Sequence, residues 1–355
     1  MKIAFLGDIA VLEERSLQNG EQYFRKVAEY LKGFDCVICN LEAAVTPRTT
    51  TWTPKSMHLR TDERIITILR QLHVDCVVLA NNHVGDYGRK GLMDTVLALK
   101  SAGIPYVGVD GTVWRVTIGD SKLSLSGFCC YSANGSQYSK TYSGQGICAL
   151  SEPSVLEQLE KDRQEGYFSL LSFHWGDEFT YYPNHRQLAF ARRVMNRDNV
   201  MIYGHHTHVM SGYERRGNAL CAYSLGNFYF DRCVSPIIKN FVVEQLPENR
   251  ESYILEVTFD GNTIQEVHTT GIYADEQELH LIDNREKVQQ ISAEISAETA
   301  VSAAYRDRRA AQIASAKQKK FAKHDLKWFL SKMNYYSICS RLLTYRNKYR
   351  YDRAF

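Results

Sequence analysis

The chain has 355 residues, of which 44% are hydrophobic and 12% aromatic, which is enough to bury one large core or two smaller ones. No stretch approaches the roughly 18 consecutive apolar residues that a membrane-spanning helix needs. The opening residues, MKIAFLGD, follow a strand pattern and not that of a signal peptide. These features exclude an integral membrane protein and predict a globular protein of the cytoplasm.

The net charge of +3 conceals an uneven distribution. Residues 301–355 hold 14 Lys and Arg against three Asp and Glu, whereas the preceding 300 residues hold 29 against 37. A basic tail on an acidic body predicts a separate partner for the tail. The nine cysteines are odd in number and scattered, which fits a reducing compartment and no disulfide framework. Cys36 and Cys39 would face opposite sides of a strand, so we interpret them as buried thiols.

The first hundred residues alternate short β-branched runs with helical patterns. Strands are predicted at 2–7, 35–39, 75–80 and 105–109, and helices at 21–33, 62–73 and 89–103, the last closed by Gly103. Strands that alternate with helices predict parallel βαβ units.

The rest of the chain changes character. A hairpin is predicted at 112–128, a polar loop at 131–147, a helix at 153–164, a buried strand at 167–173 and an antiparallel meander at 212–272. From about residue 284 the pattern is helical, with Val288, Ile291 and Ile295 on one stripe. We therefore expect a main domain at 1–283 and a basic helical extension at 284–355, docked on the body or on a second copy.

Polar side chains follow five of the predicted strands. The stretch YGHHTHV (203–209) places three histidines in four positions, and the other strand ends supply carboxylates, amides and one more imidazole. These residues are Asp8, Asn40, Glu42, Asn82, His83, His174, His206 and His208. Because functional residues gather beyond the carboxyl ends of strands in an α/β sheet, we expect one shared site.

Two carboxylates, an amide and three imidazoles suit one or two divalent transition ions such as Mn, Fe, Zn or Co. Two ions about 4 Å apart would clamp a phosphoryl oxygen and activate water. His83 directly follows Asn82, a position that suits a general acid. Asp86 either orients the His83 imidazole or caps the following helix, and the sequence favours neither.

The ordered motifs GD, NLE, NNH, HWG, GHHxH and YSLGNF resemble the calcineurin-like metallophosphoesterase superfamily, specifically its CapA branch, which is associated with capsular poly-γ-glutamate. The resemblance covers about residues 1–245. It implies a four-layer α/β/β/α sandwich, with His83 as general acid and metal ligands at Asp8, Glu42, Asn82, His174, His206 and His208. The chain departs from the superfamily at Ala10, where a DxH motif has histidine, and at Glu42, which replaces an aspartate.

Four further residues are candidates for substrate contact: Asn40, Glu178, His205 and Asn227. The sequence around Glu178 is equally consistent with a solvated loop carboxylate. The motif that contains Asn227 is also consistent with a tight turn.

The leading hypothesis is a metal-dependent hydrolase of capsule or envelope polymer synthesis, acting on a polymer, peptide or phosphoester. The alternatives are an epimerase or amide-bond enzyme on the same fold, and a non-catalytic scaffold. The basic, aromatic tail suits a helix on an anionic membrane surface, or one that packs on the protein itself. Nucleic acid is not expected, because no recognised binding motif is present. A homo-oligomer is left open.

Overall fold

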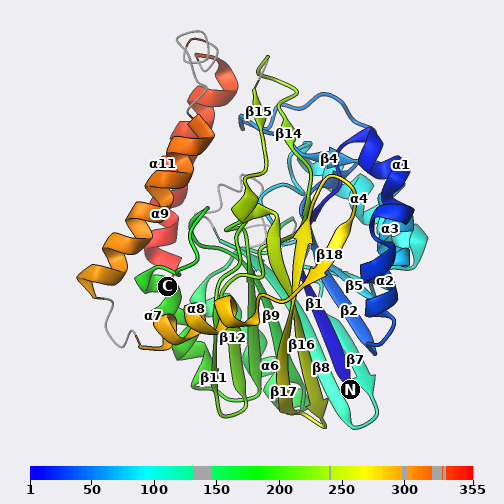
Figure 1. Cartoon of the computed structure of the whole chain (residues 1–355), viewed down its shortest axis with the longest axis vertical. Coiled ribbons are helices and arrows are strands. Elements are labelled where there is room, and N and C mark those ends of the chain that lie inside the picture. Colours follow the sequence, from blue (N-terminus) through cyan, green and yellow to red (C-terminus); the bar gives the residue numbers. More distant parts are fainter. Residues whose placement is uncertain (131–145, 240, 298–301, 322–329, 331–332, 355) are drawn as a thin grey trace.

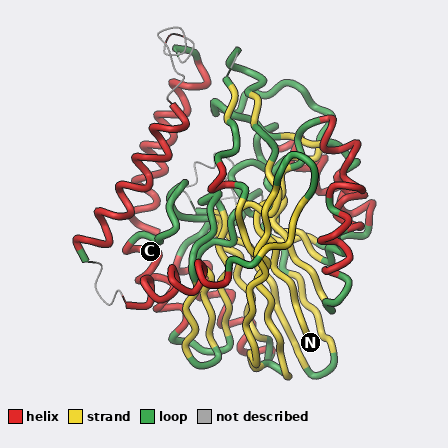
Figure 2. Tube along the Cα trace, in the orientation of Figure 1, coloured by secondary structure: helices red, strands yellow, loops and turns green. Residues whose placement is uncertain are grey.

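The structure is a computed structural model that describes residues 1–130, 146–239, 241–297, 302–321, 330 and 333–354. Two β-sheets lie face to face between two sets of helices (Figures 1 and 2). This arrangement is the four-layer α/β/β/α sandwich that the sequence predicted. Most of the predicted polar loop, residues 131–145, lies outside the described residues.

The larger sheet has eight strands and contains the N-terminal βαβ units. Its strands are β1 (Lys2–Ala10), β2 (Cys36–Leu41), β5 (Cys76–Val78), β6 (Tyr106–Val107), β13 (Asn227–Phe230), β16 (Glu251–Asp260), β17 (Thr263–Ala274) and β18 (Leu279–Ile282). They follow the order β18-β17-β16-β1-β2-β5-β6, and β13 also pairs with β1. Strands β1, β2, β5 and β6 are parallel, so their carboxyl ends lie at one edge.

The smaller sheet has six strands in the order β11-β12-β10-β9-β8-β7. Their bounds are β7 (Trp114–Ile118), β8 (Ser121–Cys129), β9 (Phe168–His174), β10 (Val200–His205), β11 (Tyr213–Arg216) and β12 (Ala219–Ala222). Strands β8, β9, β10 and β12 are parallel. Two small ribbons, β3 (Ala44–Val45) with β4 (Arg60–Thr61) and β14 (Cys233–Val234) with β15 (Val242–Val243), lie outside the main sheets, as does a 3₁₀ turn at Pro247–Asn249.

Helices cover the outer faces of both sheets (Figure 1). On the side of the larger sheet lie α1 (Glu14–Tyr23), α2 (Arg25–Leu31), α3 (Ile65–Gln71) and α4 (Gly88–Ala102). On the smaller sheet, α6 (Glu152–Glu165) packs against β9, and α7 (His185–Met195) packs against β10 and β12. The C-terminal helices are α8 (Arg285–Ala297), α9 (Ala303–Phe321) and α11 (Tyr335–Ala354).

Aromatic contacts join the inner faces of the two sheets. The rings of Phe5 on β1 and Tyr203 on β10 lie 4.8 Å apart, and those of Phe168 on β9 and Phe259 on β16 lie 5.1 Å apart. All four side chains are buried. Pairs of this kind add about 0.5–1.5 kcal/mol each beyond the area they bury.

Two local predictions were wrong. The helix predicted at 21–33 begins earlier, at Glu14, and is divided at Phe24 into α1 and α2. The predicted meander at 212–272 is split between the sheets, because β12 pairs in parallel with β10, whereas β16 and β17 extend the larger sheet from β1. Alternating polarity reveals a hairpin but does not say which sheet it joins.

Other local predictions are confirmed. Gly103 closes α4 in the left-handed conformation, with φ of 70°. Val288, Ile291 and Ile295 are buried, so α8 docks on the body as its stripe predicted. Cys36 and Cys39 are buried thiols, as interpreted from the strand pattern. Within the described part of the chain, no helix combines the length and apolar character needed to cross a bilayer.

Candidate metal centre

The five polar strand ends meet where the two sheets meet. Strands β1, β2 and β5 of the larger sheet bring Asp8, Glu42 and Asn82, and strands β9 and β10 of the smaller sheet bring the imidazoles. Two overlapping groups have donor atoms within 4.8 Å of one another: Glu42, His174 and His206 form one, and Asp8, Glu42 and His208 form the other. Glu42 belongs to both groups.

Glycines at two positions allow the backbones to approach closely at this site. A Cβ at Gly7 would lie 2.0 Å from the carbonyl oxygen of Gly226, and a Cβ at Gly204 would lie 1.9 Å from that of Tyr223. No side chain fits at such distances. The first approach lets β13 run beside β1, where the Asp8 N–H donates to the Gly226 carbonyl over 3.0 Å. The glycines thereby fix the backbones that carry Asp8 and the histidine stretch.

Asp8 is fully buried and held from three sides. Its Oδ1 accepts a hydrogen bond from Asn40 Nδ2 at 2.7 Å, and its Oδ2 accepts one from the backbone N–H of His206 at 3.1 Å. The Nδ1 atom of His205 lies 3.0 Å from Oδ1. Burial acts to raise the pKa of Asp8, but the contact with His205 outweighs it and holds the pKa well below its usual range. Asp8 is therefore ionised at neutral pH.

Glu42 is a fully buried carboxylate whose oxygens accept no hydrogen bond from any described residue. Its Oε1 lies 3.6 Å from His174 Nε2. Burial, followed by the nearby charge of Asp8, raises the pKa of Glu42 well above its ordinary value. A buried, unsatisfied carboxylate is costly unless a missing cation completes its surroundings.

Two imidazoles of the smaller sheet, those of His174 and His206, are neutral. Burial lowers the pKa of His174 well below its ordinary value and that of His206 to about 4. The Nδ1 atoms of both rings are buried and have no hydrogen-bond partner among the described residues. The other ring nitrogen of His174, Nε2, lies 3.0 Å from Asn82 Oδ1 and 3.6 Å from Glu42 Oε1. Neutral imidazole is the form in which histidine binds a metal. The donor set therefore fits a divalent transition ion.

The loop after β10 has an unusual backbone. His206 and His208 have positive φ angles of 90° and 59°, which non-glycine residues adopt rarely. The rings of His206 and His174 lie 4.8 Å apart, while His208 Nδ1 lies 3.0 Å from Asn227 Oδ1. Strained backbone of this kind is concentrated at functional sites. Here it lets both histidines reach the same space.

His83 lies in a buried network beside the cluster. Its Nδ1 is 2.6 Å from Asp86 Oδ2, and its Nε2 is 4.0 Å from Glu42 Oε1. Burial acts to raise the pKa of Asp86, but the charge of Lys55 and the contact with His83 together outweigh it and hold the pKa at about 2. The ionised Asp86 accepts the Nδ1 proton, so neutral His83 presents an Nε2 lone pair toward Glu42. Burial and Lys55 lower the pKa of His83 to about 4, which favours this neutral form.

Asp86 does not occupy the capping position of the following helix. The N-cap of α4 is Tyr87, whose side chain makes no capping hydrogen bond within the described structure. Instead, Asp86 also accepts the backbone N–H of Leu59 at 2.7 Å. It therefore ties the 51–59 loop to the His83 imidazole.

Two residues of the network were missed by sequence reasoning. Lys55 is buried, and its Nζ donates to Asp86 Oδ1 at 2.7 Å and to the Asn82 carbonyl at 2.6 Å. A lysine in a loop with no motif gives no sequence signal of this role. Asn81 accepts the backbone N–H of His83 at 3.0 Å, and the paired asparagines of LANNH were a usable signal for it.

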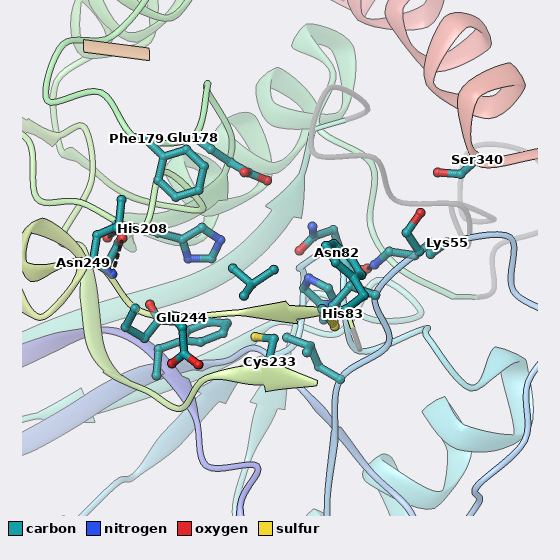
Figure 3. A pocket seen from close by; sticks show the side chains of 18 residues that line it. Lys55, Asn82, His83, Glu178, Phe179, His208, Cys233, Glu244, Asn249 and Ser340 are labelled. Carbon is teal, nitrogen blue, oxygen red and sulfur yellow. Dashed lines mark hydrogen bonds between the residues drawn. The ribbon is translucent and has the colours of Figure 1, made fainter. Parts of the chain in front are cut away.

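The four candidates for substrate contact divide into two groups. Asn40 and His205 are fully buried, and both contact Asp8. Glu178 lines a cavity beside the cluster, together with Asn82, His83 and His208 (Figure 3). Asn227 contacts His208 and lines a second cavity.

The two cavities adjoin each other. The first has a volume of about 230 Å³ and the second about 810 Å³, and they share Phe230, Glu244, Gln245 and Asn249 in their walls. The first opens directly on the metal-competent side chains. Together they provide space for a substrate longer than a single small molecule.

Residues 2–232 match the family model described as "Bacterial capsule synthesis protein PGA_cap". The chain belongs to this family. It is 30% identical over 250 residues to the capsule biosynthesis protein CapA of Bacillus anthracis, covering 65% of this chain and 60% of that protein. It is 26% identical over 249 residues to the PGA biosynthesis protein CapA of Bacillus subtilis, covering 65% and 64%. The chain thus matches less than two thirds of the length of either relative.

Among solved structures, a putative 5'-nucleotidase from Staphylococcus aureus superposes with a TM-score of 0.49 at 13% identity, over 83% of this chain and 58% of that one. That likeness is too low to carry an argument. The family match confirms the resemblance to the CapA branch, and the layers seen here confirm the fold that it implied.

Proposed function

We propose that this chain is a metal-dependent hydrolase of capsule polymer synthesis, acting on a poly-glutamate type polymer or on a peptide or phosphoester precursor of it. One observation carries the proposal: a buried set of unsatisfied carboxylate and imidazole atoms lies beside His208, which lines a cavity. A scaffold would gain nothing from donors that destabilise the empty fold.

The residues that would hold one or two divalent transition ions (Mn, Fe, Zn or Co) are Asp8, Glu42, Asn82, His174, His206 and His208. Such an ion, when bound, polarises the phosphoryl or carbonyl oxygen of a substrate and lowers the pKa of water. Asn40 and the His206 N–H hold Asp8 in place for this task. Ala10, buried in β1, offers no donor, so the smaller sheet supplies most of the imidazoles.

His83 would move the proton. Its neutral ring accepts a proton at Nε2 from the attacking water, and Asp86 stabilises the imidazolium that forms. The protonated ring can then donate the same proton to the leaving group. His83 acts as the general acid in this sequence only after it has first served as the base.

Two measurements on one preparation test the function. Protein purified without chelator should contain close to one or two transition ions per chain by mass spectrometry of the elements. It should also hydrolyse bis(4-nitrophenyl) phosphate or poly-γ-glutamate in a manner abolished by chelation and restored by Mn²⁺, Zn²⁺ or Co²⁺. Metal-free protein that recruits none of these ions would contradict the proposal and support the scaffold hypothesis.

The lone pair on His83 also favours a second function, proton abstraction next to a carbonyl in a peptide or amino acid. A neutral imidazole held by a carboxylate is a base of the kind that an epimerase needs. Incubation with glutamyl peptides in D₂O separates the two functions. Deuterium at Cα without hydrolysis would support the epimerase, and hydrolysis without deuterium the hydrolase.

The C-terminal helix α11 has one face on the body and another in solvent. Tyr336 OH donates to the Thr51 carbonyl at 2.9 Å, and Ser337 is buried. Tyr335, Ile338, Leu342 and Tyr345 are 52–82% exposed at helical spacing, and Arg341 is exposed beside them. We propose that this exposed stripe binds an anionic membrane surface, where basic residues contribute about 1 kcal/mol each.

Vesicles containing phosphatidylserine test the membrane proposal. Full-length protein should bind them in a salt-sensitive way, and truncation at about residue 325 should remove binding while the body stays folded. The variant Ile338→Ser/Leu342→Ser keeps the docked face and should also lose binding. Equal binding by all forms would exclude the tail as an anchor. Dimers seen by light scattering, lost in the same variant, would assign the stripe to a second copy.

The division of the chain at residues 283 and 284 stays a prediction.

A further inference from the structure

The cavity beside the candidate metal centre has an apolar wall. Its lining includes Phe179, Phe230, Phe241, Val243 and Leu246, opposite the polar side chains of the site. Figure 3 shows Phe179 on one side of His208 and Cys233 on the other. The apolar and metal-competent residues therefore share one space of about 230 Å³.

The wall reaches the site itself. The ring of Phe230 lies 5.0 Å from that of His208, and the ring of Phe179 lies 6.2 Å from it. A group bound between His208 and His83 would thus have apolar surface next to it. Apolar walls with a few convergent polar groups are the usual composition of small-molecule sites.

Hydrogen bonds anchor this wall to the strands of the site. Asn249 Nδ2 donates to the His208 carbonyl at 2.9 Å, and Gln245 Nε2 donates to the Asp231 carbonyl at 3.0 Å. The backbone N–H of Ser235 donates to the Phe241 carbonyl at 2.9 Å. The wall is therefore built into the fold before a ligand arrives.

A γ-linked chain of glutamates offers such a wall only two methylenes per residue, each pair flanked by a charged carboxylate. We propose that the substrate is an amphiphile, with an anionic ester or amide at the metal centre and an alkyl or aryl group in this cavity. The inference rests on the proposed function, because it places the scissile group at the candidate ligands. Each methylene that leaves water contributes about 0.8 kcal/mol, equivalent to about fourfold in affinity.

A series of n-alkyl phosphates from methyl to hexyl, titrated calorimetrically into full-length protein loaded with Mn²⁺, tests the proposal. Affinity should rise by about fourfold for each methylene until the cavity is full. The variant Val243→Trp should narrow the cavity and remove the dependence of affinity on chain length. Val242→Trp is the matched control, because its neighbour Val243 lines the cavity and Val242 does not.

The outcomes separate this inference from the function on which it rests. If methyl phosphate binds but affinity does not rise with chain length, the amphiphile proposal is wrong and the hydrolase proposal is unaffected. A gain that survives in Val243→Trp would also overturn it, because the alkyl group would then lie elsewhere. Protein that takes up no metal and binds no member of the series overturns both proposals.

Discussion

The two sheets of this protein bring different chemistry to the same place. The larger sheet supplies the oxygen donors Asp8, Glu42 and Asn82, whereas the smaller sheet supplies the nitrogen donors His174, His206 and His208. On the larger sheet, Asp8 is ionised and the pKa of Glu42 is raised, whereas on the smaller sheet burial keeps His174 and His206 neutral. Neither sheet alone holds a complete ligand set, so the candidate site exists only where the two meet.

This difference shows how packing turns ordinary strand ends into a site. Both sheets have parallel strands, and Glu42 lies 3.6 Å from His174 across the junction. The predictions that follow remove one side of the junction at a time.

The largest effect is expected from the smaller sheet. The double substitution His206→Ala/His208→Ala should abolish metal binding and any metal-dependent hydrolysis, because two imidazoles leave together. Elemental analysis and turnover on bis(4-nitrophenyl) phosphate measure both effects. The control His268→Ala removes a histidine that is 62% exposed on β17 and should change neither. Full metal content in the double variant would refute the assignment of these ligands.

The next largest effect, on stability, is expected at Lys55, which contacts Asp86 beside the strand ends of the larger sheet. Lys55→Met leaves the buried, ionised Asp86 without its cation and should lower the free energy of unfolding by about 3–5 kcal/mol. Denaturant titration measures this loss. Lys26→Met breaks the exposed pair with Glu278 and should cost less than about 1 kcal/mol. Similar losses in the two variants would show that the Lys55 pair is not a buried ion pair in solution.

A smaller, purely kinetic effect is expected at His83. His83→Asn should lower turnover by roughly 100-fold, the scale of a lost proton-transfer group. Metal content should stay unchanged, since His83 lies beside the cluster and not within its two donor groups. Unchanged turnover in this variant would remove His83 from the mechanism.

The smallest effect is a pH dependence set by Glu42. Because its pKa is raised in the empty site, a proton competes with the ion, and metal affinity should fall with decreasing pH by up to about tenfold per unit. Calorimetric titrations in buffers of different ionisation enthalpy should show proton release on binding. Glu42→Gln should bind the ion more weakly and release fewer protons. If proton release does not change in this variant, the released proton comes from another group.

Sequence reasoning went furthest where a residue's role follows from its place on a strand. Glu42 and His174 lie at or just beyond the end of a buried strand, Asp8 lies two residues before the end of β1, and parallel strands bring such ends to one edge. The stripe of Val288, Ile291 and Ile295 likewise predicted the docking of α8. These are local patterns, and local patterns can be read from the chain alone.

Contacts between distant segments could not be predicted in this way. Lys55 reaches Asp86 from a loop 31 residues earlier in the chain, and no motif marks it. The hairpin β11–β12 joined the smaller sheet and the hairpin β16–β17 the larger one, although both are antiparallel pairs. Asn40 and His205 turned toward Asp8 because burial required partners for its carboxylate.

The sequence by itself thus determined the types of donor, the strands that carry them and the family that shares their order. Only the tertiary structure decided that Glu42 lies between the two donor groups, that His83 presents a lone pair, and that an apolar wall adjoins the site. The physical reason is that burial, electrostatic fields and cavities are properties of surfaces packed together from remote parts of the chain. A pattern of neighbouring residues contains no record of them.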